Sequence, residues 1–296
     1  GGLFIVPPFG ASSVGFCNRR IDALASILAF LKHQKEKYVV LSDAHIAVNF
    51  DFKALLEAHI ESGADVTVAY AEEELPVISD HVQPGAKGFF YSLQLDGNHV
   101  TKIKINPQDP GKQNFSMNIY VMDRELLIDQ VNTAFVRGNI YFERDVLAPN
   151  LEKLNVQAFK FDGYYARIND MKSYFNENMK LLEDENLDGL FAPNPVYTKI
   201  RDDNPTRYIS GSKVKNIMAA DGCVIEGEVE NSILFRGVKI GKGAKVKNCV
   251  LMQDTVVEEG ANLEYVISDK NVHITAGKEL KGTDTLQVFV EKRKVV

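Results

Sequence analysis

The sequence predicts two domains, an α/β domain followed by a parallel β-helix. Near the C-terminal end, apolar anchors recur about every 17 residues, at Ile240, Val257 and Ile274. A fixed period with stacked apolar anchors is typical of a solenoid protein. Upstream of this repeat, segments with helical periodicity alternate with short strand-like apolar runs, which is the pattern of an α/β domain.

Each repeat contains a second apolar anchor six residues after the first, and a glycine-bearing stretch (GKGAK, EEGAN, TAGKE) lies between the two anchors of each pair. Three six-residue sides make one triangular coil, so the aliphatic anchors are expected to stack inside and the small residues to fit the corners. Gly237, Gly241 and Gly243 are accordingly interpreted as corner residues and not as a phosphate loop. The predicted inward-pointing residues are Val229, Ile240, Val246, Val257, Leu263 and Ile274.

The predicted elements of the α/β domain follow in chain order. Helices are expected over 21–31, 52–62, 142–154 and 171–182, and a further helix is expected to start at Arg124. Gly63 is the expected end of the second of these helices. Strands are expected over 37–42, 65–70, 116–122 and 156–161, with an antiparallel pair in 89–105 around Asp96-Gly97-Asn98. The helix–strand alternation predicts parallel strands joined by crossovers. Three prolines in 185–206 mark a linker, so the predicted domains are 1–185 and 208–296, joined by 186–207.

Composition narrows the class of protein. The 296 residues are 45% hydrophobic and 25% charged, with a formal net charge of −6, which disfavours non-specific binding to nucleic acid or to an anionic membrane. No apolar run is long enough to span a bilayer. Three cysteines (Cys17, Cys223 and Cys249) lack metal-ligand spacing, which indicates reduced thiols in a cytoplasmic protein; the two in the repeat are expected to pack as small apolar side chains.

A glycine-rich phosphate loop normally opens a nucleotide-binding α/β domain. This sequence has none, and it starts on an apolar run, GGLFIVPPFG, that leads into a predicted loop. We therefore expect that the first part of the α/β domain is missing from this chain.

Several motifs resemble those of the bacterial glucose-1-phosphate adenylyltransferases (ADP-glucose pyrophosphorylases). Tyr38-Val-Val-Leu-Ser-Asp-Ala-His-Ile resembles the family's strand ending in Gly-Asp-His-Ile, and Ser116-Met-Asn-Ile-Tyr-Val-Met resembles Ser-Met-Gly-Ile-Tyr-Val-Phe. Phe161-Asp-Gly-Tyr-Tyr-Ala-Arg-Ile-Asn-Asp and the segment after it resemble Gly-Tyr-Trp-x-Asp-Ile-Gly-Thr and its helix. The resemblance covers nearly the whole chain. It implies a nucleotidyltransferase-like (Rossmann-like) mixed sheet followed by a left-handed β-helix.

The departures from the family pattern fall on its catalytic positions. The resemblance places the two magnesium-binding aspartates of the family at Ala44 and Arg167, and the sugar-phosphate lysine at Asn106. Asp43 lies one residue early, and on a strand this shift turns a side chain to the opposite face. Magnesium prefers carboxylate oxygens, so the family's Mg²⁺ is not expected to bind, and no cofactor is predicted for this chain.

The pattern resembles the GlgD-type subunits of these enzymes, in which catalysis has decayed. The resemblance implies a regulatory role in glycogen biosynthesis, with a catalytic homologue as partner in a hetero-oligomer or with a homo-oligomer as the other form. Asp43, His45, Ser116 and Asn118 are the positions where a vestigial substrate site is expected. Two alternatives stay open: an active sugar-1-phosphate nucleotidyltransferase that uses displaced ligands such as Asp43, and a non-enzymatic scaffold of the same architecture.

Four further features are weighed against simple structural roles. His45 at a strand end is expected to be a structural hydrogen-bonding residue more than a direct participant. His273 has no predicted partners for general-base catalysis, so a solvated or packed histidine is expected. Arg19-Arg20 suits a phosphate contact and a solvated helix start equally well. The basic run Lys292-Arg293-Lys294 is interpreted as solvated.

Overall fold

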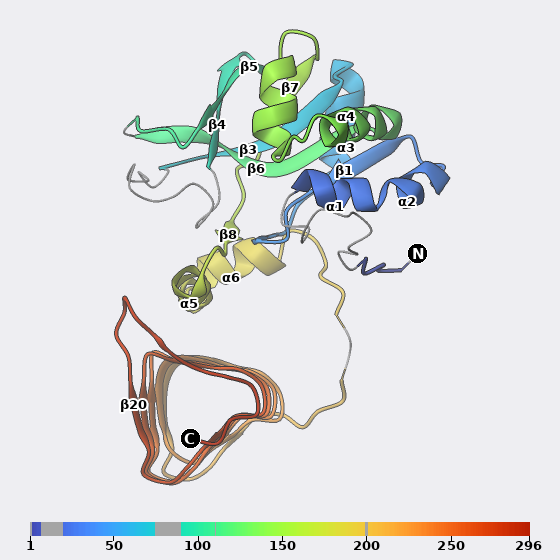
Figure 1. The fold of residues 1–296 in the computed structure, drawn as a ribbon. Helices are drawn as coiled ribbons and strands as arrows, with labels where there is room; N and C mark the ends of the chain where they lie inside the picture. Colours follow the sequence, from blue (N-terminus) through green and yellow to red (C-terminus); the bar gives the residue numbers. More distant parts are fainter. Residues whose placement is uncertain (1, 7–19, 75–89, 110, 199–200) are drawn as a thin grey trace. The chain divides into compact units, whose positions relative to one another are not determined.

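The computed structural model describes residues 2–6, 20–74, 90–109, 111–198 and 201–296 (Figure 1). These residues form two compact units. The first contains Gly1–Ala44 and Asp51–Asp162, and the second contains His45–Phe50 and Gly163–Val296. Cys17 and Arg19 lie outside the described residues.

The first unit is built on a six-stranded mixed sheet in the order β1-β6-β3-β7-β5-β4. Strands β1 and β3 are both antiparallel to β6, which lies between them, and β3 is parallel to β7. The first two predicted strands therefore do run in the same direction, but they are not neighbours. The strands are β1 (Tyr38–Leu41), β3 (Val66–Glu74), β4 (Tyr91–Asp96), β5 (His99–Ile105), β6 (Lys112–Asp123) and β7 (Val156–Lys160).

Two helices of the first unit begin at aspartate residues whose side chains cap them. The carboxylate of Asp51 accepts the backbone N–H groups of Lys53 and Ala54 at the start of α3 (Phe52–Ser62), and Gly63 ends this helix in the left-handed conformation, with φ 61°. Asp123 caps α4 (Arg124–Val136) in the same way. The helix predicted over 21–31 is divided into α1 (Arg20–Ser26) and α2 (Leu28–His33).

The helix predicted over 142–154 is only partly correct. A short π-helix covers Phe142–Leu147 and a 3₁₀ turn covers Ala148–Asn150, so the segment ends early, at Pro149 and the turns that follow. The π-helix still turns its apolar side chains toward the core: Phe142, Val146 and Leu147 are all buried.

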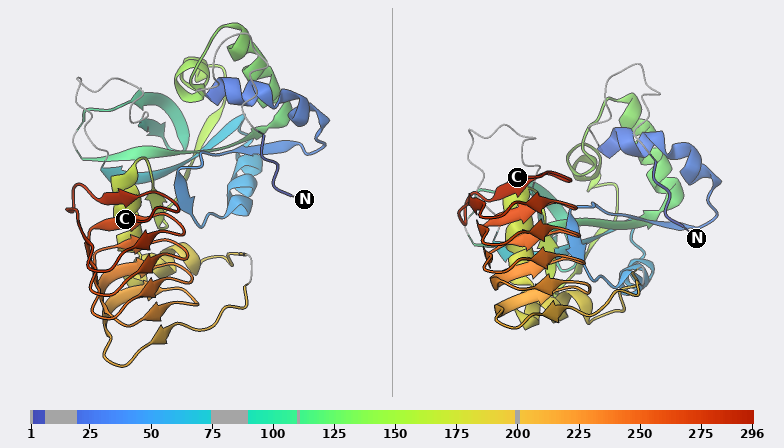
Figure 2. Two further views of the ribbon diagram at one scale, coloured as in Figure 1. Left: turned by 60° about the horizontal axis from the view of Figure 1, so that its bottom comes forward. Right: turned by 90° about the horizontal axis from the view of Figure 1, so that it is seen from below.

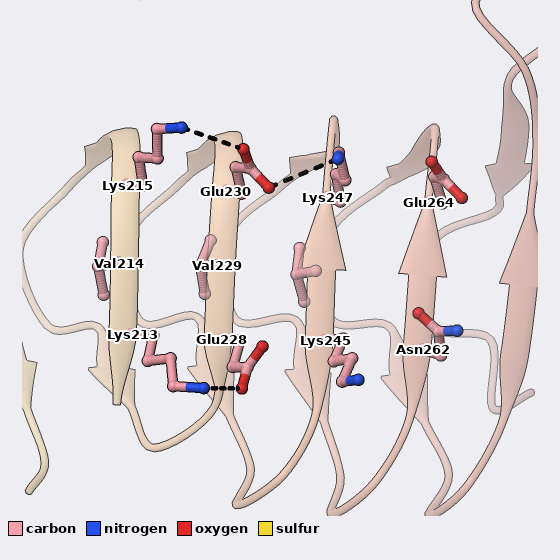
Figure 3. Close-up of a pocket in the computed structure, with 11 residues that line it drawn as sticks. Lys213, Val214, Lys215, Glu228, Val229, Glu230, Lys245, Lys247, Asn262 and Glu264 are labelled. Carbon is pink, nitrogen blue, oxygen red and sulfur yellow. Dashed lines mark hydrogen bonds and ion pairs between the residues drawn. The ribbon is translucent and has the colours of Figure 1, made fainter. Parts of the chain in front are cut away.

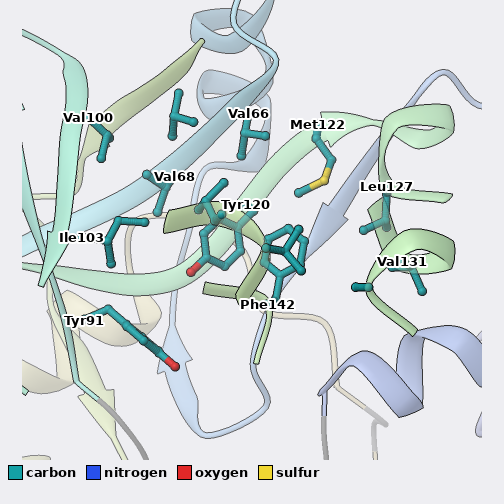
Figure 4. Close-up of a cluster of buried hydrophobic side chains, with 14 of the residues drawn as sticks. Val66, Val68, Tyr91, Val100, Ile103, Tyr120, Met122, Leu127, Val131 and Phe142 are labelled. Carbon is teal, nitrogen blue, oxygen red and sulfur yellow. The ribbon is translucent and has the colours of Figure 1, made fainter. Parts of the chain in front are cut away.

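The core of the first unit forms between the sheet and these helices (Figure 4). Tyr120 and Phe142 are among its largest fully buried side chains, with ring centroids 5.6 Å apart in an edge-on arrangement. Val66, Val68 and Met122 line the neighbouring strands. This packing fixes the carboxyl end of β1 and the middle of β6, where the candidate site lies.

The second unit contains a two-stranded antiparallel sheet, two helices and a β-helix. Strand β2 (Ile46–Val48) pairs with β8 (Tyr165–Arg167), and neither strand was predicted. Helix α5 (Met171–Lys180) begins with a capping box formed by Asp170 and Ser173. Helix α6 (Asp184–Phe191) extends into the segment predicted as a linker. The unit that holds the β-helix thus includes all residues from Gly163 onward, so it extends upstream of the boundary predicted near residue 185.

The repeat folds as the parallel β-helix that its period predicts, with coils stacked on one another (Figure 2). Val229 is in register with Val246, and Val246 with Leu263; Ile240 is likewise in register with Val257 and Ile274. All six predicted anchors are buried, at 2% exposure or less. The strands are β9 (Arg207–Tyr208), β10 (Lys213–Ala219), β11 (Val224–Ile225), β12 (Glu228–Leu234), β13 (Lys239–Ile240), β14 (Lys245–Lys247), β15 (Val250–Leu251), β16 (Val256–Val257), β17 (Asn262–Glu264), β18 (Val266–Ser268), β19 (His273–Ile274), β20 (Glu279–Lys281) and β21 (Val288–Val290).

Small residues at the corners allow the coils to stack closely. A Cβ atom on Gly241 would lie 2.8 Å from the backbone of Glu258 in the next coil, which is too close for any side chain. Phe175 of α5 packs against Val250 and Ile267 on the outer surface of the coils. Helix α5, which follows the Gly163-Tyr-Tyr motif in the sequence, therefore contributes to the hydrophobic packing of the second unit.

Candidate functional site

The position expected for a metal-binding aspartate lies in a turn of the first unit. Strand β1 ends at Leu41, so Asp43 and Ala44 lie in the turn that follows, and strand alternation does not decide where their side chains point. Ala44 is exposed and offers no donor atom, while the side chain of Asp43 is 22% exposed.

A bulge in β6 brings Asn118 to this turn. Ala69 of β3 pairs with Ile119 and Tyr70 pairs with Ser116, so Met117 and Asn118 are extra residues in β6. Asn118 adopts the left-handed conformation, with φ 56°, which asparagine tolerates better than most residues. Its side-chain amide donates a hydrogen bond to Asp43 Oδ2 at 2.7 Å.

A single arginine joins two carboxylates beside this bulge. The guanidinium of Arg20, the first residue of α1, contacts Asp43 Oδ1 through Nη2 and Glu143 Oε1 through Nη1. Arg20 is 17% exposed and Glu143 5% exposed. Tyr120 donates its hydroxyl to Glu143 Oε1 at 3.1 Å, and Ser116 donates to Asn118 Oδ1 at 3.3 Å. We call these residues the Arg20 cluster: Arg20, Asp43, Ser116, Asn118, Tyr120 and Glu143.

Burial governs the electrostatics of the Arg20 cluster. Desolvation raises the pKa of Tyr120 well above its ordinary value, and the nearby carboxylate of Glu143 raises it further. The phenol therefore stays protonated and acts as a hydrogen-bond donor. A buried carboxylate is costly unless it is paired and hydrogen-bonded, and Arg20 supplies the charge that both carboxylates need.

The donor atoms of this site do not fit the magnesium ion of the related enzymes. Arg20 contacts one oxygen of Asp43 and Asn118 contacts the other, so both are engaged by hydrogen-bond donors. Ala44 contributes no oxygen. Among the residues that the structure describes, no group of three or more His, Cys, Asp or Glu side chains is placed to hold a metal ion. A cation would have to displace Arg20 to reach the two carboxylates.

Asn106 forms two hydrogen bonds with Phe90 at the end of the β4–β5 pair. Its side-chain Oδ1 accepts the backbone N–H of Phe90 at 2.9 Å, and its own N–H donates to the Phe90 carbonyl at 2.8 Å. Its backbone is left-handed, with φ 47°. Lys104, two residues upstream, pairs with Asp109 at 2.6 Å.

His45 and Arg167 belong to the second unit, where they lie on its two-stranded sheet. Arg167 is opposite Ile46 in the β2–β8 pair, and the carbonyl of His45 accepts the N–H of Ile168 at 2.8 Å. Both side chains are half-buried. Of the expected site residues, the structure thus brings Asp43, Ser116 and Asn118 together in the first unit, and His45 and Arg167 in the second.

Two residues of the Arg20 cluster were not singled out from the sequence. Glu143 lies in a predicted helix outside the quoted motifs, and Tyr120 lies within the motif that begins at Ser116, but neither was proposed as a site residue. The signal that could have found Glu143 is its place in a short segment with the apolar residues Phe142, Val146 and Leu147, all of which are buried as it is. Arg20 itself was left undecided between a phosphate contact and a solvated helix start; its side chain instead binds carboxylates.

The β-helix carries two further groups of polar side chains. Lys and Glu alternate along one outer face, where they line a groove of about 480 Å³ (Figure 3). On another face, His273 Nε2 lies 2.6 Å from Glu258 Oε1, so this histidine does have a carboxylate partner, contrary to expectation. Cys223 and Cys249 are buried, as predicted. No helix among the described residues has the length and apolar character needed to cross a membrane.

Comparisons with known proteins match both units of the chain. A family model described as "Nucleotidyl transferase" matches residues 18–184, and one described as "GlmU-like, C-terminal hexapeptide" matches residues 199–287. These matches confirm the predicted order of a nucleotidyltransferase-like domain and a hexapeptide β-helix.

Individual relatives agree with the family resemblance drawn from the sequence. "Glycogen biosynthesis protein GlgD" of Bacillus subtilis is 32% identical over 90% of this chain and 65% of that protein. "Glucose-1-phosphate adenylyltransferase" of Geobacillus stearothermophilus is 32% identical over 83% of this chain and 63% of that protein. The enzyme of the same name from Bacillus cytotoxicus is 28% identical over 98% and 77%. The chain therefore spans slightly less than two thirds of the length of the first two relatives.

Proposed function

Because this chain belongs to the nucleotidyl transferase family, whose model covers residues 18–184, we propose that it is a regulatory, non-catalytic subunit of a glucose-1-phosphate adenylyltransferase. The partner would catalyse the formation of ADP-glucose and diphosphate from ATP and glucose 1-phosphate in glycogen biosynthesis. The similarity to a protein named for glycogen biosynthesis and to two adenylyltransferases supports this assignment.

The observation that carries the proposal is the engagement of Asp43 by Arg20 and Asn118. Nucleotidyl transfer gathers negative charge at the α-phosphorus, and a bound divalent metal neutralises it. Asp43, which precedes the expected metal-ligand position Ala44 in the sequence, is here held by a guanidinium, and Ala44 itself has no ligand atom. Asp43 is thus poorly suited to be a displaced metal ligand, which disfavours the active-enzyme alternative.

The other catalytic positions support the same conclusion. Asn106 carries no charge for a sugar phosphate, and its Oδ1 accepts the backbone N–H of Phe90. Arg167 brings a positive charge to the position of the second aspartate. Each ~1.4 kcal/mol of lost transition-state stabilisation is about tenfold in rate, so losing metal and phosphate neutralisation together should reduce turnover to near background.

The proposed partner is a catalytic homologue in a hetero-oligomer. Apolar side chains remain exposed on the first coil of the β-helix, with Tyr208 at 56% and Val214 at 36%. The open end of a solenoid needs a cap or a partner. Regulation would then act through contacts that differ between two states of the partner. A homo-oligomer is the other assembly that could cover this exposed apolar surface.

The test is a turnover assay of the full-length chain, with and without its catalytic homologue. We expect near-background formation of ADP-glucose by the chain alone, and altered effector response of the partner when the two are mixed. Turnover by the chain alone at a rate comparable to the partner would contradict the proposal. If the catalytic homologue keeps its normal effector response and does not associate with this chain in solution, the result would favour the alternative of a non-enzymatic scaffold.

A further inference from the structure

We propose that one corner of the β-helix binds a neutral sugar. Four residues occupy this corner on successive coils, each one position after the charged residues that the strand registers align. We call them the asparagine corner: Asn216, Asn231, Asn248 and Tyr265. This inference goes beyond the proposed regulatory role, and it stands whether or not that role is correct.

The backbone of the asparagine corner does not by itself explain its side chains. All four residues are left-handed, with φ between 45° and 52°. Glycine adopts this conformation most readily, and three other left-handed positions one repeat apart are all glycine: Gly243, Gly260 and Gly277. Asparagine tolerates the left-handed region, but a residue as bulky as Tyr265 is an outlier there. An outlier of this kind points to a task for the side chain.

The asparagine corner lines a cavity of about 280 Å³ within the second unit. The other lining residues come from α5 and the turn after it: Phe175, Met179, Leu182 and Glu183. The ring of Tyr265 lies 6.0 Å from the ring of Phe175, measured between centroids, at an interplanar angle of 51°. The cavity thus has a polar wall of carboxamides and an apolar, partly aromatic wall.

The hydrogen-bonding capacity of this corner is only partly used inside the protein. Asn216 Nδ2 donates to Asn231 Oδ1 at 2.9 Å. Within the part of the chain that the structure describes, neither the side-chain amide of Asn248 nor the hydroxyl of Tyr265 has a hydrogen-bond partner, and both residues are half-buried. A carboxamide offers two donor hydrogens and an acceptor oxygen, so Asn248 can bind a ligand in the cavity through both.

The chemistry of the lining favours a neutral sugar over an anion. A carboxamide can bind two neighbouring hydroxyl groups at once, donating to one and accepting from the other. An aromatic ring packs against the apolar face of a sugar ring. Among the described residues that line the cavity none is basic, so a phosphate group would find no counter-charge. The volume is near the lower end for ligand sites, which suits one or two sugar rings.

The experiment titrates the full chain with maltose, a neutral disaccharide, by calorimetry and by NMR of the side-chain amides. We expect saturable binding in the millimolar range that shifts the amide signals of Asn231 and Asn248. Asn248→Gly keeps the left-handed backbone and removes the carboxamide, so its binding should be about tenfold weaker. Tyr265→Asn removes the ring and should weaken binding to a similar extent.

Asn271→Gly is the matched control. Asn271 is also left-handed, with φ 59°, but it does not line the cavity. This variant should bind maltose as the unmodified chain does, which separates the loss of one carboxamide from a general effect of glycine on the coils.

Three outcomes would overturn the proposal. The first is an unmodified chain without saturable maltose binding, and the second is Asn248→Gly binding maltose as well as Asn271→Gly does. The third is a shift of the Asn248 amide signals by inorganic phosphate but not by maltose. If Asn248→Gly fails to fold, Asn248→Asp decides, because it removes only the amide donor; undiminished binding would then contradict the proposal. Turnover by the unmodified chain alone would contradict the proposed function without changing these maltose results.

Discussion

Asn118 has both a backbone role and a side-chain role. Its left-handed conformation makes the bulge in β6, and its amide holds Asp43. The related enzymes' motif has glycine at this position, and both residues tolerate this backbone. Asparagine keeps the bulge and adds a side-chain amide that donates a hydrogen bond to Asp43. A sequence comparison alone would count this change only as a substitution.

A pair of substitutions at Asn118 separates these roles. Asn118→Gly should lose the side-chain hydrogen bonds to Asp43, Ser116 and Tyr120. Asn118→Ala should lose the same bonds and also hold a Cβ atom in the left-handed region, at a cost of about 1–2 kcal/mol relative to the glycine variant. We expect the alanine variant to be the less stable by about this amount in urea unfolding. Equal stability of the two variants would mean that the bulge relaxes freely.

His59 makes the stability of the first unit depend on pH. It is 3% exposed, its Nδ1 lies 2.8 Å from Thr67 Oγ1, and burial lowers its pKa below the ordinary 6.5. The unfolded chain therefore takes up a proton near pH 6.5 that the folded chain takes up only at lower pH. The contribution to stability is present above pH 6.5 and decreases as the pH falls below it.

We expect the free energy of unfolding to fall between pH 7.5 and 5.5, and to fall less in His59→Gln. His33→Gln, at an exposed position, is the control for replacing a histidine with glutamine as such. Urea titrations at both pH values measure this. An identical slope in the His59 variant would show that another group carries the pH dependence.

At the scale of elements, the β-helix carries a ladder of alternating charges on one face (Figure 3). Lys215, Glu230, Lys247, Glu264 and Lys281 occupy equivalent positions on successive strands. Glu230 lies 3.7 Å from Lys215 and 3.5 Å from Lys247. Opposite charges on neighbouring strands favour this stacking register over shifted ones.

Glu230→Lys should place three lysines side by side. We expect a loss of about 1 kcal/mol in unfolding free energy at low salt, and a smaller loss in 1 M NaCl, where the Debye length is about 3 Å. Glu259→Lys, at an exposed position outside this ladder, is the control. A loss that does not depend on salt would assign the effect to packing.

At the scale of the whole molecule, the two compact units have separate hydrophobic cores. A unit with its own core can unfold by itself. Cys223 and Cys249 report on the second unit alone, since both are buried there, and burial raises the pKa of the Cys249 thiol to about 12. Their thiols should stay unreactive until that unit opens.

We therefore predict that Arg20→Met and Glu230→Lys act on different units. In a Cys17→Ser background, the urea midpoint of thiol labelling should shift with Glu230→Lys and stay unchanged with Arg20→Met. Labelling with a disulfide reagent along a urea series measures this midpoint. A common shift in both variants would show that the units unfold together.

The sequence by itself determined the β-helix. Its period, its six anchors and its corner glycines are local features that repeat, and inward stacking follows from them directly. It also placed Asp43, Ser116 and Asn118 on the segments that carry the candidate site. Helix ends such as Asp51 and Gly63 follow from capping, which is decided within one turn.

The tertiary structure decided what the site is made of. Arg20, Asp43 and Glu143 meet only because β6 lies between β1 and β3 and the π-helix packs on Tyr120. No periodic pattern encodes that meeting, since it depends on strand order and on one bulge. The same holds for α5, whose Phe175 packs against Val250 and Ile267 on the outer surface of the β-helix. Local patterns specify elements, whereas the partners of a buried charge are set by long-range packing.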